Sequence, residues 1–147
     1  MAEKISLLCS KIANKDLVLP EFQREFTWRK DQSRDLIDSL LKGYPTGSLL
    51  FWKTSEDIAL KNMKDYNPQG MLEILLDGQQ RLTVLYMLLR DDIPPYYSEE
   101  EIDKDPRNLY YNLWTSDLKY YKQKEMDNNP FWVRVCDLGL IKMFSCP

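Results

Sequence analysis

The chain has 147 residues, of which 44% are hydrophobic and 29% are charged, and its formal net charge is -3. This length and apolar content predict one folded domain and exclude an intrinsically disordered chain. The negative charge gives no overall attraction to a phosphate backbone, so we do not expect the chain alone to bind free duplex DNA. The chain contains no histidine, which excludes an HNH nuclease centre, a Ser-His-Asp triad and histidine metal ligands.

The apolar stretches are far shorter than the roughly 20 residues that span a bilayer, and the N-terminus lacks the pattern of a secretory signal. The three cysteines, Cys9, Cys136 and Cys146, form no C-x-x-C pair. We therefore expect a cytoplasmic protein, without a membrane partner, whose thiols pack in its core rather than form disulfides or a zinc site.

Helical spacing of apolar residues predicts a first helix over residues 3 to 13 and a second over residues 30 to 42. Gly43 is placed for a left-handed C-terminal cap of the second helix. Between the two helices, residues 17 to 19 predict a short strand that ends at Pro20, because proline donates no ladder hydrogen bond.

Two apolar runs, residues 48 to 53 and 71 to 76, predict buried strands bounded by turn residues. Helical spacing returns directly after the second run and predicts a helix over residues 79 to 90. We expect these strands and the strand of residues 17 to 19 to share one sheet. The helices of residues 30 to 42 and 79 to 90 are expected to pack against that sheet, which gives a small α/β domain.

The pattern is weaker beyond residue 90. Residues 91 to 106 are acidic and contain two adjacent prolines, so we expect a loop or a weakly structured excursion. Residues 109 to 114 and 132 to 137 resemble strands, and the tyrosine-rich residues 118 to 123 are expected to be helical. The last residues carry no capping signal, and we expect that the chain is part of a longer protein.

The strongest local motif is Asp77-Gly78-Gln79-Gln80-Arg81, between a predicted strand and a predicted helix. A helix N-terminus presents unpaired N–H groups and about half a positive charge, and a glycine lets a phosphate approach closely. Arg81 adds a guanidinium that suits the same phosphate. The motif is therefore a candidate phosphate site.

The same motif has a second interpretation, which spacing alone favours. Asp77 as N-cap with Gln80 three residues later would form a capping box worth about 1 kcal/mol, with no ligand. A capping carboxylate would also repel a phosphate at the same helix end. If both were present, Asp77 would have to turn aside, toward a magnesium ion or a ribose hydroxyl.

Two further segments could contribute to a site. Polar and aromatic residues alternate from Phe22 to Trp28, which commonly indicates a half-buried edge strand. In the functional interpretation, Gln23 and Arg24 point into a shared polar cleft, and Trp28 offers a stacking face or closes the core. Residues 43 to 48 form a glycine-containing turn that lacks the ending of a Walker motif, so we interpret it as a turn.

Three sequence blocks, LPEFQREFTW, GYPTGSLLFW and LLDGQQRLTVLYMLL, resemble the N-terminal domain family of GmrSD-type restriction proteins, whose hallmark is DGQQR. The resemblance is closest over residues 5 to 90 and looser through residue 138. That family is similar to the ParB and sulfiredoxin folds. The resemblance thus implies a single nucleotide-handling domain over residues 1 to 147, of the α/β (α+β) class, with a mixed sheet and packed helices.

The resemblance implies binding and hydrolysis of a nucleoside triphosphate (NTP) with Mg²⁺, in control of a C-terminal HNH-type nuclease that acts on foreign or modified DNA. That nuclease half has no counterpart here, so DNA would be a partner only of the full-length protein. The implied residues are Asp77, Gln79, Gln80 and Arg81 for catalysis, Gln23, Arg24, Gly78 and Arg81 for nucleotide binding, and Asp77 for the metal.

Two alternatives stay open. The first is a non-catalytic module that senses a nucleotide or DNA and relays a state to a partner. The second is a stand-alone nuclease of the ParB superfamily, which ranks last because metal-ligand carboxylates are not clustered and the sequence pI is about 5.1.

Overall fold

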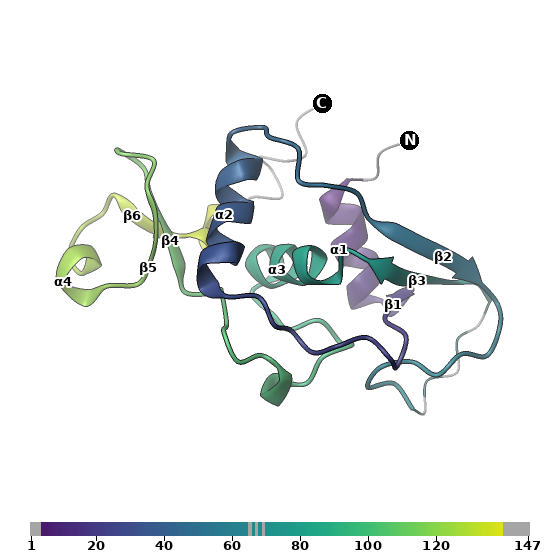
Figure 1. Ribbon diagram of the computed structural model, residues 1–147. Coiled ribbons are helices and arrows are strands. Elements are labelled where there is room, and N and C mark those ends of the chain that lie inside the picture. The colour runs from purple at the N-terminus through teal and green to yellow at the C-terminus, as the bar shows by residue number, and fades with distance from the viewer. Residues whose placement is uncertain (1–3, 65, 67, 69, 140–147) are drawn as a thin grey trace.

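The computed structural model describes residues 4–139 except residues 65, 67 and 69, and it has the mixed α/β architecture expected from the sequence (Figure 1). Its helices are α1 (Ile5–Ala13), α2 (Lys30–Leu41), α3 (Gln79–Arg90) and α4 (Gln123–Met126), with 3-10 turns η1 (Glu99–Glu101) and η2 (Val135–Leu138). Its strands are β1 (Leu17–Val18), β2 (Leu50–Thr54), β3 (Leu72–Asp77), β4 (Leu109–Asn112), β5 (Leu118–Tyr120) and β6 (Trp132–Arg134).

The first sheet has the strand order β1-β3-β2, with β1 parallel and β2 antiparallel to the central strand β3. The three strands predicted to share a sheet therefore do so. Of the apolar residues of the central strand β3, Leu72, Ile74 and Leu75 are buried and Leu76 is exposed. β2 begins at Leu50, two residues later than predicted, and its pairing with β3 is irregular between Leu50 and Phe51. The expectation of a buried strand was wrong for β2, in which only Thr54 is buried, because β2 lies at the edge of the sheet.

α1 packs against α3 and β1, whereas α2 lies between α3 and β5 (Figure 1). The expectation that α2 packs against the first sheet was wrong. The buried side of α2, which carries Leu36 and Ile37, belongs to the one hydrophobic core that also includes α3 and both sheets, but its closest neighbours are α3 and β5. Gly43 has the predicted left-handed conformation after α2, with φ +71°.

The second sheet is antiparallel, with the order β5-β4-β6, and lies beyond α2 on the side away from the first sheet (Figure 1). The predicted helix over residues 118 to 123 was wrong, because residues 118 to 120 form β5 and pair with β4. The pairing supplies ladder hydrogen bonds that helical propensity could not match. The predicted strand over residues 132 to 137 ends early, since residues from Val135 onward turn into η2.

The expected loop over residues 91 to 106 is better ordered than its composition suggested. Tyr96 is fully buried, Tyr97 is 5% exposed, and both belong to the main hydrophobic core. The Tyr96 hydroxyl hydrogen-bonds the hydroxyl of Thr83 in α3 at 3.1 Å. This segment is thus a wall of the core and not a weakly structured excursion.

Cys9 is buried and Cys136 is half-buried, and both are free thiols. Burial raises the pKa of each thiol to about 12, so neither is a thiolate at neutral pH. Cys146 lies outside the described residues. None of the helices in the described part of the chain has the length and apolar character needed to cross a bilayer.

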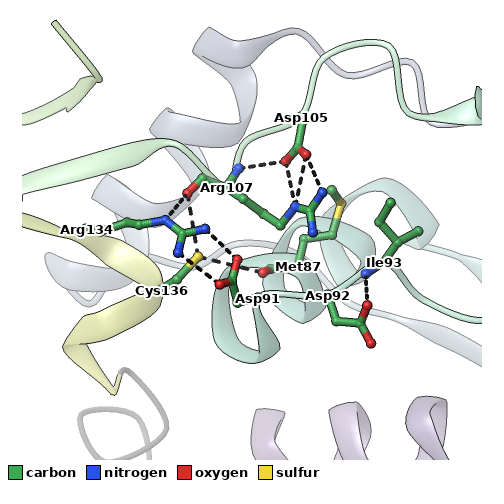
Figure 2. Close-up of polar contacts among 8 residues, drawn as sticks. All are labelled: Met87, Asp91, Asp92, Ile93, Asp105, Arg107, Arg134 and Cys136. Atoms are coloured by element: carbon green, nitrogen blue, oxygen red, sulfur yellow. Dashed lines mark hydrogen bonds and ion pairs between the residues drawn. The ribbon is translucent and has the colours of Figure 1, made fainter. Parts of the chain in front are cut away.

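An arginine–aspartate pair fastens β6 to the C-terminal end of α3 (Figure 2). The guanidinium of Arg134 donates to both oxygens of the Asp91 carboxylate, at 2.9 and 2.5 Å, and to the carbonyl oxygen of Arg107 at 3.0 Å. Asp91 ends α3 in the left-handed conformation. The hydrogen bond from Arg134 holds the pKa of this carboxyl below its ordinary value.

We expect the Asp91–Arg134 pair to make stability depend on pH. Because the folded-state pKa of Asp91 is lowered, its contribution is present above the unfolded pKa and is lost as pH falls through the folded pKa. Arg134→Gln should lower the free energy of unfolding at neutral pH by about 1 kcal/mol, since both side chains are partly exposed. The difference from wild type should shrink below about pH 4.

Urea unfolding at several pH values checks this expectation. Arg29→Gln, which breaks a more exposed pair with Asp31, is the matched control and should change little. A difference between wild type and Arg134→Gln that is constant down to strongly acidic pH would contradict the role of the Asp91 charge.

Candidate functional site

A pocket of about 440 Å³ lies where the end of β3 and the first turn of α3 meet the segment of residues 22 to 28. Its charged side chains are two arginines and one aspartate, so it is locally positive although the chain as a whole is negative. Every site residue predicted from the sequence lines this one pocket. The full lining is Phe22, Gln23, Arg24, Trp28, Leu76, Asp77, Gly78, Gln79, Gln80 and Arg81.

The turn from β3 to α3 is made by Gly78, which is the N-cap residue of α3 and has φ +89°. A left-handed conformation with a positive φ favours glycine. A β-carbon here would lie 2.3 Å from Cδ2 of Leu49 and 3.1 Å from Nη2 of Arg81, so the space beside the backbone is closed as well. The first N–H groups of α3, which have no partner within the helix, begin at this turn on the pocket side.

The capping-box interpretation of Asp77 and Gln80 was wrong. Asp77 is the last residue of β3, paired with Leu50, and α3 has no side-chain cap. Gly78 occupies the N-cap position, so Asp77 stands one residue before the position from which a side chain caps the helix. Asp77 is exposed and lines the pocket, and its carboxylate makes no hydrogen bond or ion pair with any described residue.

Gln80 holds the segment of residues 24 to 28 against α3. Its Oε1 accepts from the N–H groups of Thr27 at 2.9 Å and Trp28 at 3.3 Å, and its Nε2 donates to the Glu25 carbonyl oxygen at 3.0 Å. Gln80 is 5% exposed, and a buried amide without hydrogen-bond partners would cost free energy. These three bonds avoid that cost. Gln80 therefore fixes one wall of the pocket.

Arg81 holds the turn that precedes β2. Its Nη1 and Nη2 donate to the carbonyl oxygens of Thr46 and Ser48, both at 2.7 Å. Gly47 lies so close to this guanidinium that a β-carbon would be 2.3 Å from Nη1, and its φ is +92°. Residues 43 to 48 are thus a turn, as predicted, and sequence reasoning missed that Arg81 is what holds it.

Residues 22 to 28 do not form the half-buried edge strand that their alternation favoured. The segment has no strand pairing except an isolated bridge between Phe26 and Ile102, because Gln80 takes up the backbone groups of residues 25, 27 and 28. Gln23 donates from Nε2 to the Leu76 carbonyl oxygen at 3.2 Å. Trp28 packs against the core, one of its two predicted uses.

The Arg24 side chain is exposed, lines the pocket and makes no hydrogen bond or ion pair with a described residue. Its backbone, in contrast, is tied down: its carbonyl oxygen accepts from the Tyr97 hydroxyl at 2.9 Å and from Gln79 Nε2 at 3.5 Å. A guanidinium on a fixed backbone, with its donors unused, suits an anionic ligand.

A divalent cation would find one protein ligand in this pocket. Asp77 supplies a carboxylate, and the described residues hold no group of three or more acidic or thiol side chains that could enclose a metal by themselves. Mg²⁺ is commonly held by one or two carboxylates, waters and substrate phosphates. The pocket therefore fits Mg²⁺ that arrives with a phosphate ligand, and does not fit a metal held by the protein alone.

Comparison with known proteins shows the family to which this chain is similar. The model of the GmrSD restriction endonuclease N-terminal domain matches residues 5–137, which include the pocket and both sheets. The chain is also 28% identical over 145 residues to an uncharacterized protein of Methanocaldococcus jannaschii, an alignment that covers 84% of this chain and 25% of that relative. The chain thus spans about a quarter of the length of the relative it matches. It belongs to the family of GmrSD restriction endonuclease N-terminal domains.

Proposed function

We propose that the pocket binds a nucleoside triphosphate by its phosphates. The observation that carries the proposal is the exposed Arg24 guanidinium, which has no hydrogen bond or ion pair among the described residues and lines the pocket beside the N-terminus of α3. A helix N-terminus favours negative charge, and an arginine fork matches phosphate oxygens. The chain belongs to a restriction endonuclease family, which supports a functional role for this pocket in binding a ligand.

The two arginines have different tasks in this proposal. Arg24 is the direct phosphate ligand, because its donors are unused by the described residues. Arg81 already donates to Thr46 and Ser48, so it contributes positive charge and shape, with three of its five donors left over. Gly78 forms the tight turn that places the N-terminus of α3 at the pocket, and Gln23 also lines the pocket.

The metal role falls to Asp77, whose carboxylate oxygens would be a ligand of Mg²⁺ bound with the nucleotide. Bound Mg²⁺ neutralises charge on the phosphates and thereby favours phosphoryl transfer. Asp77 does not oppose the phosphates by capping the helix, because it sits at the end of β3.

Hydrolysis is the proposed activity in the full-length protein, and the two glutamines contribute to it differently. Gln80 has its amide engaged by the backbone of residues 25 to 28, so its role is to position that segment. Gln79 makes one long hydrogen bond, 3.5 Å to the Arg24 carbonyl oxygen, and is the candidate that orients an attacking water.

The second candidate function is a sensor that binds the nucleotide without turnover. It is favoured by the burial of both glutamines, 7% exposed for Gln79 and 5% for Gln80, which leaves little of either amide facing an incoming water. In either case, we propose that the bound state controls a DNA nuclease elsewhere in a longer protein. Steady phosphate release by pure protein separates the NTPase from the sensor.

The proposed binding is tested by melting the protein with ATP, GTP, CTP or UTP, each with Mg²⁺ or with EDTA. A nucleotide at 100 times its dissociation constant adds about 2.7 kcal/mol to the free energy of unfolding, which is a visible rise in Tm. We expect at least one of the four to raise Tm, and a larger rise with Mg²⁺.

Asp77→Asn should remove most of the additional stabilisation that Mg²⁺ gives, while the melting of the nucleotide-free protein stays close to wild type. The reason is that the Asp77 carboxylate makes no hydrogen bond or ion pair with a described residue, so we expect its charge to matter mainly for metal binding. Asp103→Asn, exposed and outside the pocket, is the matched control. An undiminished Mg²⁺ effect in Asp77→Asn would exclude the metal role.

A further inference from the structure

A segment far along the chain, residues 96 to 102, contacts the backbone of the Arg24 segment without lining the pocket itself. Tyr97 reaches from this segment to the Arg24 backbone, where its hydroxyl donates to the carbonyl oxygen at 2.9 Å. The bridge between Phe26 and Ile102 joins the same two segments a few residues further on. None of the sequence motifs includes this contact.

Tyr97 is itself held from several sides. Its ring packs edge-on against Tyr96, with centroids 5.2 Å apart and planes at 70°, and Tyr96 is hydrogen-bonded to Thr83 of α3. The Lys61 ammonium lies 5.7 Å from the Tyr97 ring centroid and pairs with Glu101 at 3.1 Å. A ring fixed in this way can direct its hydroxyl at one acceptor.

We propose that Tyr97 is a positioning residue for nucleotide binding, because it fixes the backbone from which the Arg24 guanidinium extends into the pocket. This inference rests on the proposed function. Gln79 reaches the same carbonyl oxygen only at 3.5 Å, so Tyr97 makes the shorter of the two bonds. Burial raises the pKa of Tyr97 well above its ordinary value, which keeps the hydroxyl a donor at any working pH.

The role predicts a specific energetic coupling. Tyr97 would act on the ligand through Arg24 alone, so its contribution should disappear when the Arg24 guanidinium is absent. If Tyr97 had a merely structural role, the effect of Tyr97→Phe on the binding free energy would instead add to that of Arg24→Ala. Tyr97 would influence contacts with the phosphates and not with the base. Its loss should therefore weaken the binding of inorganic tripolyphosphate by the same factor as the binding of a nucleotide.

The test uses four variants, Tyr97→Phe, Tyr66→Phe, Arg24→Ala and the double variant Tyr97→Phe/Arg24→Ala. Calorimetric titrations with the best-binding NTP and with tripolyphosphate, Mg²⁺ present, are run below the melting temperature of the least stable variant. Tyr97→Phe should weaken the binding of both ligands roughly three- to tenfold, the scale of one hydrogen bond. Tyr66→Phe is the matched control, because it removes a hydroxyl that also donates to a backbone carbonyl oxygen, that of Lys15 at 3.0 Å, outside the pocket, and it should bind as wild type.

In the Arg24→Ala background, Tyr97→Phe should have no further effect. The inference would be overturned if Tyr97→Phe bound both ligands as tightly as wild type. It would also be overturned if Tyr97→Phe weakened binding by the same factor in the Arg24→Ala background as in wild type, or if it weakened binding of the nucleotide but not of tripolyphosphate. These results leave the proposed function standing if Arg24→Ala still weakens binding. A wild-type protein that binds neither ligand would overturn the proposed function, and this inference with it.

Discussion

Replacing Gly78 with alanine is expected to lower the free energy of unfolding by roughly 2 to 4 kcal/mol, from strain in the left-handed conformation together with overpacking. Gly78 has φ +89°, and the new β-carbon would meet Leu49 at 2.3 Å and Arg81 at 3.1 Å. Leu49 and Arg81 both contact or form the turn before β2. If either side chain moved away from the new β-carbon, the packing of the other would be disturbed.

Urea unfolding of Gly78→Ala beside Gly43→Ala separates strain from crowding. Gly43 also has a positive φ, +71°, but a β-carbon there meets nothing within 4 Å. Its replacement should therefore cost only the conformational term, about 1 kcal/mol. Equal losses in the two variants would show that the close approach of Leu49 and Arg81 to Gly78 contributes nothing.

The parts of the fold that sequence could predict are those set by local periodicity. α3 was predicted over residues 79 to 90 and occupies Gln79–Arg90, because its apolar spacing is regular and a glycine precedes it. Apolar runs likewise predicted β2 and β3 and their common sheet, although β2 is mostly exposed and not buried as expected. Beyond residue 90 the tyrosines of residues 118 to 123 were assigned to a helix, since pairing with β4 is a long-range effect that no local pattern carries.

The candidate site divides in the same way. Every site residue predicted from the motifs lines the pocket. For the DGQQR residues this could be predicted because strand, turn and helix follow one another directly in the chain. The partners of these residues come from elsewhere: Arg81 binds the turn at Thr46 and Ser48, and Tyr97 binds Arg24. Tyr97 follows two prolines in an acidic segment, a context that carries no signal of its contact with a residue over 70 positions earlier.

The capping interpretation of Asp77 failed for a related reason. Spacing alone cannot tell whether the residue before a helix completes a strand or caps the helix, and the answer depends on how far the ladder with β2 extends. Because the ladder reaches Asp77, the carboxylate is left for the pocket. Asp77 therefore does not occupy the helix N–H groups, but its carboxylate lines the same pocket, so a bound cation is needed to offset its repulsion of a phosphate.

The largest expected effect on binding is that of Arg24→Ala. Loss of a charge-assisted hydrogen bond to phosphate should weaken NTP binding by about 1.5 to 3 kcal/mol, roughly ten- to 150-fold. The fold should be retained, because the exposed Arg24 side chain has no partner among the described residues. Arg34→Ala is the matched control, since Arg34 is a partly exposed arginine outside the pocket that pairs only with its neighbour Asp35 among the described residues.

The most direct measurement is a calorimetric titration of wild type, Arg24→Ala and Arg34→Ala with nucleoside triphosphate up to millimolar concentration in the presence of Mg²⁺. We expect saturable binding by wild type, the same affinity in Arg34→Ala, and an affinity at least about tenfold lower in Arg24→Ala with unchanged melting of the free protein. Absence of binding by wild type, or equal affinity in all three proteins, would contradict the assignment of this pocket as a phosphate site.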